Sequence, residues 1–229
     1  MTLAIIAVLL GAVAQATSGL GFALVSGPLL FATLGPAEGL LTVVTLSSVL
    51  NAVILIREHR AIRYADCALV LVPAVVTTLL LARRLGRVDA DSSSIVAGTL
   101  TVVAAVLLLR GLRIPALGGR FGAAGTGVVS AVMNSLAGIG GPPVALYTAN
   151  ANWSAAATRA SMQAIFLVLN VALLSQRGLP NLSPALLAAM AVGYAAGVLI
   201  TRRLSESAAR RATLLFAVFG GVALVVRSV

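Results

Sequence analysis

The polar side chains inside the apolar stretches of this chain are neutral, and they recur in pairs. Gln15 and Asn134 each precede a glycine-rich interruption by four residues, which is about one helical turn. Asn51 and Asn170 each lie deep in a later apolar stretch. An amide in an apolar setting needs hydrogen-bond partners, so it either joins neighbouring helices or contacts a polar ligand. Both interpretations stay open for these four residues.

Titratable groups are missing from the middle of the apolar stretches. His59, the single histidine, lies in a loop, Cys67 is the single cysteine, and there is no lysine. General acid–base catalysis needs a titratable group at the substrate, and metal-ligand spacings are also absent. We therefore expect no enzyme activity, no metal and no cofactor. All six acids lie in loops or at the ends of stretches: Glu38, Glu58, Asp66, Asp89, Asp91 and Glu206.

Two interruptions, at residues 19–22 and 138–143, break stretches that are otherwise helical in character. In lipid, an interrupted backbone is tolerated only where protein buries it or a polar cavity receives it. A helix that starts there has N–H groups without acceptors, and its dipole adds about half a positive charge. Two such helix starts that face each other would bind an anion without any charged side chain. The alternative is that each glycine pair serves only close helix packing or a kink.

The composition is that of an integral membrane protein. The 229 residues are 60% hydrophobic with a mean hydropathy of +1.08, and only 10% are charged, whereas a soluble domain carries about 25%. The net charge of +10 comes from arginine, as is usual for cytoplasmic loops of membrane proteins. With aromatics at 4% and no basic stripe between them, nucleic-acid binding is not expected. We expect an all-α fold in contact with the lipid bilayer.

Ten apolar runs are expected to form helices. The first five cover about residues 2–17, 22–34, 37–56, 67–85 and 92–109. The second five cover about residues 121–137, 142–150, 155–175, 184–203 and 211–227. The first two runs of the first set are each shorter than the roughly 20 residues that cross a bilayer. We therefore predict that each set begins with a broken, re-entrant hairpin and continues with three transmembrane helices.

The two sets align without a gap when the sequence is shifted by 119 residues. Matching glycines, asparagines and paired arginines indicate an internal duplication, because such matches are rarer than apolar ones in this chain. We predict a first repeat at 1–110, a cytoplasmic linker at 111–120 and a second repeat at 121–229. The aligned pairs include Gly19 with Gly138, Gly21 with Gly140, Asn51 with Asn170, and Arg83-Arg84 with Arg202-Arg203.

The distribution of arginine favours inverted repeats. If residues 2–34 and 121–150 each return to the side they came from, eleven arginines fall on one side and five on the other. A single crossing at each place would give eight on each side. The positive-inside rule favours the biased count, which places both termini outside the cytoplasm. Inverted repeats with interrupted helices are the usual plan of secondary transporters, which bind substrate near the membrane midplane.

Residues 18–22, Gly27-Pro28, Asn51 and residues 138–143 together resemble the TauE/SafE family of bacterial membrane proteins, the sulfite exporter and sulfonate permease type. The resemblance covers essentially the whole chain. It implies a multi-pass protein of the bacterial inner membrane that transports sulfur-containing anions or small organic acids. The first motif has Phe22-Ala23 where the second has Gly141-Pro142, so the halves need not contribute equally.

Together these features predict a secondary transporter, most simply an exporter, of a small anion such as sulfite, an organosulfonate or a related organic acid. A passive anion channel and a non-transporting membrane scaffold are the alternatives, and self-association is left open. The anion is expected at the midplane between the two broken helices. The candidate substrate-binding residues are Gln15, Gly19, Gly21, Phe22, Asn51, Asn134, Gly138, Gly140, Gly141, Pro142 and Asn170.

Overall fold

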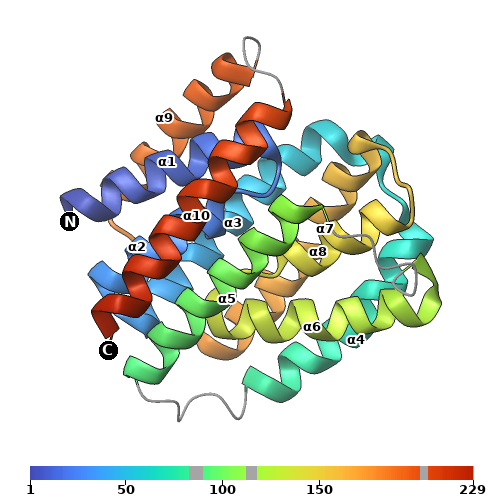
Figure 1. Ribbon diagram of the computed structural model, residues 1–229, viewed down its shortest axis with the longest axis horizontal. Coiled ribbons are helices and arrows are strands. Elements are labelled where there is room, and N and C mark those ends of the chain that lie inside the picture. Colours follow the sequence, from blue (N-terminus) through green and yellow to red (C-terminus); the bar gives the residue numbers. More distant parts are fainter. Residues whose placement is uncertain (83–89, 112–117, 202–205, 229) are drawn as a thin grey trace.

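The computed structural model describes residues 1–82, 90–111, 118–201 and 206–228. Within these ranges the chain is all-helical, as predicted, with one helix for each of the ten apolar runs (Figure 1). Most of the predicted linker and the paired arginines at 83–84 and 202–203 lie outside the described residues. The helices are α1 (Thr2–Ser18), α2 (Phe22–Leu34), α3 (Pro36–Glu58), α4 (Tyr64–Ala82), α5 (Ala90–Arg110), α6 (Arg120–Ala137), α7 (Gly141–Asn150), α8 (Ala155–Arg177), α9 (Pro184–Thr201) and α10 (Glu206–Ser228), with a 3-10 turn η1 (His59–Ala61).

Four helical segments of the described chain are long and apolar enough to cross a membrane: α3 with η1, α4, α8 and α9. Three shorter apolar helical segments accompany them, at α1, α2 and residues 94–110 of α5. Of the three full spans predicted in each half, two are therefore confirmed by helix length and composition. The third of each half, α5 or α10, falls outside the set of four.

Local signals in the sequence explain where the long helices begin. Gly35, with φ of +80°, precedes α3, which starts at Pro36. Proline suits the first turn of a helix because its missing N–H would have no intrahelical acceptor there. Ser154 precedes α8, and its hydroxyl oxygen accepts the N–H of Ala157 at 3.2 Å. Such a side-chain cap satisfies one of the free N–H groups at a helix start.

The helices pack in reciprocal pairs. By the 119-residue shift, α1 is equivalent to α6, α2 to α7, α4 to α9 and α5 to α10. Helix α1 packs on α9 as α6 packs on α4, and α2 packs on α10 as α7 packs on α5. Other large contacts join α3 to α8, α5 to α10, α1 to α2, α2 to α3 and α4 to α8, and the last two have no equally large counterpart. Helices α3 and α8 differ by 119 residues at both ends (155 − 36 and 177 − 58). Such an exchange of equivalent partners is the contact pattern that a two-fold axis produces. The repeat boundaries at 110 and 120 stay a prediction.

Glycines bring the backbones of these pairs close together. A Cβ atom at Gly197 of α9 would lie 2.6 Å from the Cβ of Ala16 of α1. One at Gly193 would overlap the backbone oxygen of Leu9, and one at Gly127 of α6 would overlap that of Val70 in α4. Small residues allow such close approach where helices associate in lipid. The α1–α9 and α6–α4 interfaces are equivalent, but the close glycines lie on α9 in the first and on α6 in the second.

The chain turns back at each glycine-rich interruption. A Cβ atom at Gly11 of α1 would lie 3.0 Å from both the carbonyl oxygen of Phe22 and the Cβ of Ser26, so α2 runs back along α1. In the second half, a Cβ atom at Gly118 would lie 3.5 Å from the carbonyl oxygen of Asn150. The start of α6 and the end of α7 therefore lie at the same end of the molecule. Each broken segment forms a helical hairpin.

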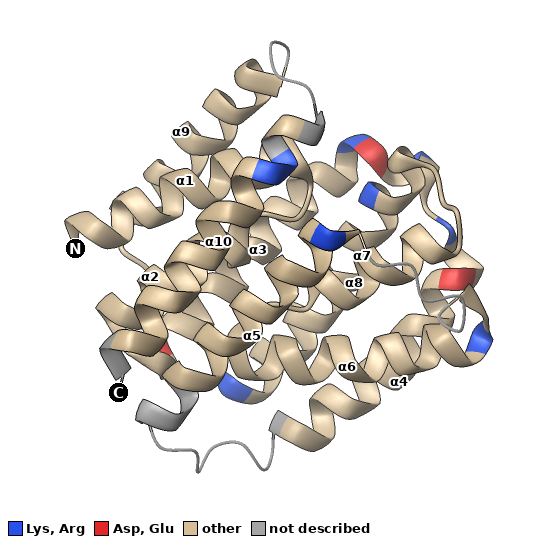
Figure 2. Ribbon diagram, viewed as in Figure 1, with Lys and Arg blue, Asp and Glu red and all other residues tan. Residues whose placement is uncertain are grey.

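Arginines gather at that same end of the molecule, which we call the arginine-rich end. Arg159 Nε at the start of α8 lies 3.0 Å from Glu58 Oε2 at the end of α3, and the N–H of Arg63 donates to Ser161 Oγ at 3.1 Å. Figure 2 shows most arginine segments around these helix ends and one at the lower left. Of the nine arginines with described side chains, eight lie here: Arg57, Arg60, Arg63, Arg110, Arg120, Arg159, Arg210 and Arg211.

Arg177 lies at the opposite end. It is the last residue of α8, 18 positions after Arg159, which is about 27 Å along a helix. The loop that follows it meets the start of α3, where the N–H of Asn181 donates to Glu38 Oε1 at 2.9 Å. The described arginines are thus strongly biased toward one end of the helix bundle.

Candidate anion site

Both interruptions are built around a glycine in the left-handed conformation. Gly19 ends α1 with φ of +77°, and Gly138 ends α6 with φ of +69°. Each donates its N–H to a carbonyl oxygen four residues earlier, that of Gln15 at 2.8 Å and that of Asn134 at 2.9 Å. Side chains strain this conformation, so glycine is the residue that ends a helix in this way. The next helices begin three residues later.

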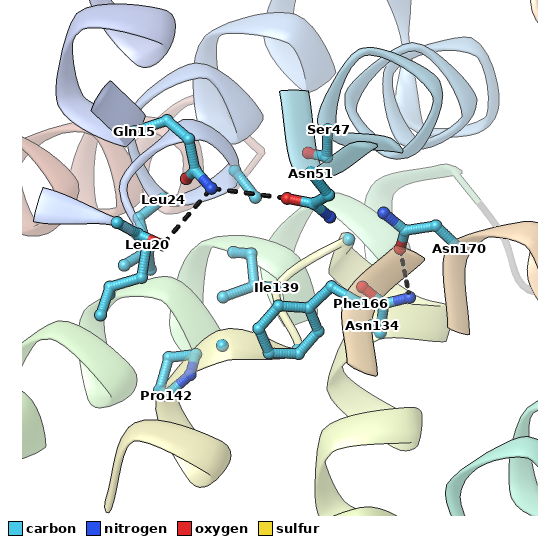
Figure 3. A pocket seen from close by; sticks show the side chains of 15 residues that line it. Gln15, Leu20, Leu24, Ser47, Asn51, Asn134, Ile139, Pro142, Phe166 and Asn170 are labelled. Atoms are coloured by element: carbon cyan, nitrogen blue, oxygen red, sulfur yellow. Dashed lines mark hydrogen bonds between the residues drawn. The ribbon is translucent and has the colours of Figure 1, made fainter. Parts of the chain in front are cut away.

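The two interruptions face each other across one cavity of about 40 Å³ (Figure 3). Nine of the eleven predicted site residues line it: Gln15, Gly19, Asn51, Asn134, Gly138, Gly140, Gly141, Pro142 and Asn170. The other lining residues are Leu20, Ala23, Leu24, Ser47, Ile139 and Phe166. Residues more than 100 positions apart in the sequence are thus brought to one place.

Gly21 and Phe22 do not line the cavity. The Phe22 side chain is 1% exposed and belongs to the apolar cluster around α1, α2, α3 and α9. A Cβ atom at Gly21 would lie 2.6 Å from the Cβ of Ala14, so this glycine allows the hairpin to close. Phe22 still contributes its backbone, because its N–H donates to Gln15 Oε1 at 3.1 Å.

The four predicted amides form two equivalent pairs. Gln15 Nε2 donates to Asn51 Oδ1 at 3.5 Å, and Asn134 Nδ2 donates to Asn170 Oδ1 at 3.0 Å. Both pairs span 36 residues, and all four side chains are buried. Each pair joins the end of the first helix of a hairpin to the long helix α3 or α8 (Figure 3). The amides therefore serve helix association, whatever else they contact.

Gln15 and Gln163 together hold the first interruption. The carbonyl oxygen of Gly19 accepts Gln163 Nε2 at 2.9 Å and Gln15 Nε2 at 3.4 Å, and Gln15 Nε2 also approaches Gln163 Oε1 at 3.2 Å. Gln163 is fully buried, yet it is not among the predicted site residues. Its equivalent, 119 residues earlier, is Val44. The only signal for it in the sequence is an amide within an apolar run, without a symmetric counterpart.

Several hydrogen-bond donors at the cavity are free. Ser47 Oγ is buried and has no partner, and within the described chain Asn51 Nδ2 has no acceptor. The first-turn N–H groups of Ala23, Leu24 and Gly141 also have none among the described residues, as expected at helix starts. None of the described residues that line the cavity is charged. Within the described chain there is also no cluster of side chains that could hold a metal ion.

The start of α7 supplies fewer donors than the sequence suggests. Helix α7 begins at Gly141, which places Pro142 and Pro143 at its second and third positions instead of the first. Neither proline has an N–H group, so two of the first-turn donors are missing. Helix α2 keeps the N–H groups of Ala23 and Leu24 at the equivalent positions. The two helix starts thus offer different numbers of N–H donors to the cavity.

Comparison with known proteins gives one informative result. Residues 3–224 match the family described as Sulfite exporter TauE/SafE. No curated protein and no solved structure matches the chain. The family match covers nearly all of the sequence, including both glycine-rich interruptions and the helices that hold them. The chain therefore belongs to the TauE/SafE family of membrane transporters and is not an enzyme.

Proposed function

We propose that the cavity between the two interruptions binds a small anion and that the protein carries this anion across the membrane as a secondary transporter. The observation that carries the proposal is that two helix starts and two buried amide pairs meet at one uncharged cavity with free donors. Donors without nearby acids favour an anion, because each helix start adds about half a positive charge. No carboxylate of the described chain lines the cavity to neutralise a cation.

The size of the cavity favours a substrate of few atoms. Its volume is about 40 Å³, against about 300–1,000 Å³ for the pockets of drug-sized ligands. Sulfite has four non-hydrogen atoms, whereas taurine and sulfoacetate carry a two-carbon chain as well. We therefore rank sulfite first among the substrates that the family implies. An organosulfonate would require the cavity to widen around Leu20, Ile139 or Phe166.

The hairpins and the arginines support an inverted-repeat topology. Each hairpin brings the chain back to the end where it began, and eight of the nine described arginines lie at the arginine-rich end. By the positive-inside rule this end faces the cytoplasm, so both termini lie outside it. In a bacterial inner membrane, the potential then drives an anion outward by ~2.3 kcal/mol per charge per 100 mV. The substrate site lies near the membrane midplane in this arrangement.

Transport in liposomes tests the proposal. The purified protein is reconstituted and offered sulfite, thiosulfate, taurine, sulfoacetate and lactate, and we expect saturable flux that is fastest for sulfite. Gly140→Leu should abolish it, because a Cβ atom there already lies 3.0 Å from Ser130 Oγ and 3.2 Å from Phe166. Gly125→Leu on α6 is the control, since nothing lies within 4 Å of its Cβ position.

Three other results would each contradict the proposal in a different way. Flux that does not saturate at millimolar anion would indicate a passive channel. Unimpaired flux in a folded Gly140→Leu variant would place the site elsewhere. No flux and no thermal stabilisation by any of the five anions would indicate a membrane scaffold.

A further inference from the structure

A second cavity of about 240 Å³ opens at the arginine-rich end, and we call it the vestibule. Its walls come from the α1–α2 turn, α7, the start of α8 and the start of α10. Two arginines, Arg159 and Arg210, line it together with Trp153, and no acid does among the residues that the structure describes. The central cavity, by contrast, has no charged lining residue.

The vestibule adjoins the central cavity. Gly19 and Leu20 line both, so the turn between α1 and α2 is the wall between them. On the central side, the Cβ of Leu20 lies 4.0 Å from the position that a Cβ at Gly141 would take. Leu20 thus lies between the two hairpins at the point where one cavity meets the other. An anion that moves from the arginine-rich end to the central cavity has a short path past this side chain.

Arg159 lies directly against the first interruption. A Cβ atom at Gly19 would lie 3.1 Å from Arg159 Cδ, so the stem of this arginine covers the glycine. Its guanidinium pairs with Glu58 at 3.0 Å, and the Arg159 side chain is 36% exposed. Each guanidinium has five N–H donors, so a single carboxylate leaves several of them free for another anion. Arg210 adds a second positive charge, and Arg63 lies 5.0 Å from the ring of Trp153.

The arginine pair has no equivalent in the other half. The residues 119 positions before Arg159 and Arg210 are Leu40 and Asp91, one apolar and one acidic. The position that corresponds to Trp153 is Leu34. The arginines and the tryptophan of the vestibule therefore come from the second half alone, although both cavities draw on both halves. This asymmetry distinguishes the two ends of the transport path.

We propose that the vestibule is an anion-capture site, in which Arg159 and Arg210 bind the anion at the arginine-rich end before it passes Leu20 into the central cavity. The proposal rests on the proposed function for the identity of the anion. Its chemistry is that of a small oxyanion held between two guanidinium groups. Because capture precedes translocation, removal of these charges raises the anion concentration needed for half-maximal flux and leaves the maximal rate unchanged.

Matched arginine substitutions on α10 test capture through flux. Arg210→Gln should raise the half-saturating sulfite concentration about three- to tenfold at low salt, from the loss of one charge a few ångströms away. Arg211→Gln, the adjacent residue that does not line the vestibule, should leave it unchanged. The difference should shrink near 1 M salt, where charges are screened beyond about 3 Å. Equal half-saturation in the two variants at low salt would overturn the proposal.

Tryptophan fluorescence provides a test that does not depend on transport. Trp153 is the only tryptophan of the chain and lines the vestibule. Iodide, an anionic quencher, should quench it more strongly in the wild type than in Arg159→Gln or Arg210→Gln, while neutral acrylamide should quench all three equally. Equal iodide quenching in all three would show that the arginines do not attract anions and would overturn the proposal. If no anion is transported but iodide still quenches the wild type more strongly than the variants, the proposed function is wrong while the capture site is supported.

Discussion

At the scale of single residues, buried amides determine how the first interruption is held. Gln163 donates to the carbonyl oxygen of Gly19, which α1 leaves without an intrahelical partner at its end. Gln15 approaches the same oxygen and also accepts the N–H of Phe22 at the start of α2. Together the two side chains fix the end of one helix and the start of the next. The free donors of Ser47 and Asn51 can then face the cavity.

Gln163→Val, which installs the residue of the equivalent position 44, should destabilise the protein. Two hydrogen bonds are lost, and each is worth roughly 0.6–1.7 kcal/mol inside a membrane protein. We therefore expect a loss of about 1–3 kcal/mol in the free energy of unfolding, measured by denaturant unfolding in detergent. Gln176→Val on the exposed part of the same helix is the control and should change it by less than about 0.5 kcal/mol. Similar losses in both variants would contradict the structural role of Gln163.

Alanine substitutions at Gly138 and Gly141 should distinguish an effect on protein stability from an effect on anion binding. Gly138→Ala places a side chain in a left-handed conformation, with its Cβ 3.0 Å from Val43, and should cost about 1–2 kcal/mol of stability. Gly141→Ala has its nearest neighbour at 3.9 Å and ordinary backbone angles, so it should unfold like the wild type. Its methyl group enters the central cavity and should weaken sulfite binding, measured by titration calorimetry. Normal binding by Gly141→Ala would place the anion outside this cavity.

Residue spacing predicted most of the cavity lining but not all of it. The 119-residue shift paired the amides and most of the glycines, and nine of the eleven predicted site residues line the cavity. Gln163 is not among the predicted site residues because the equivalent position in the first half, residue 44, is a valine. Gly21 and Phe22 are among the predicted site residues, but they face α1 instead of the cavity. The direction in which a residue faces depends on how α1 and α2 pack. Helix packing is a tertiary property that motif spacing does not contain.

At the scale of helices, close backbone contact holds α4 to α6 and α1 to α9. Gly127 and Gly125 lie two positions apart on α6 but on different sides of it. A Cβ atom at Gly127 would overlap the carbonyl oxygen of Val70, whereas nothing lies within 4 Å of one at Gly125. The helix bounds followed closely from apolar run length, since glycine and proline mark where helices begin and end. The glycine contacts between helices have no comparable signal in the run pattern.

Gly127→Ala should lower the melting temperature in detergent, because α4 and α6 must move apart to admit the methyl group. Overpacking of this kind costs roughly 1–3 kcal/mol. Gly125→Ala should instead leave stability unchanged or raise it by up to about 1 kcal/mol, because alanine favours the helix more than glycine does. Equal melting temperatures for the two variants would show that α4 and α6 do not pack through Gly127.

At the scale of the whole molecule, the arginine-rich end faces the cytoplasm in the proposed topology. Composition and arginine counting predicted a membrane protein with this bias, and the described arginines follow it. Neither the vestibule nor its connection to the central cavity could be predicted. Both depend on how the start of α10 meets the α1–α2 turn, which are nearly 200 residues apart in the sequence.

Cysteine labelling in intact cells tests the orientation. In a background where the buried Cys67 is replaced by serine, Leu179→Cys introduces a thiol at an exposed position of the α8–α9 loop. Ala156→Cys introduces one at an exposed position of the arginine-rich end. A membrane-impermeant thiol reagent should label the first variant and reach the second only after the cells are opened. The reverse pattern would invert the topology and the direction of capture.

The central claim, that an anion occupies the cavity between the two interruptions, is tested most directly by locating one there. Selenite has the shape and charge of sulfite, and its selenium atom gives an anomalous diffraction signal. In crystals soaked with selenite we predict a peak bounded by Gly19, Asn51, Gly140 and Asn170, and its loss in the Gly140→Leu variant. A transport-active protein that shows no selenium peak in this cavity at saturating selenite would contradict the account.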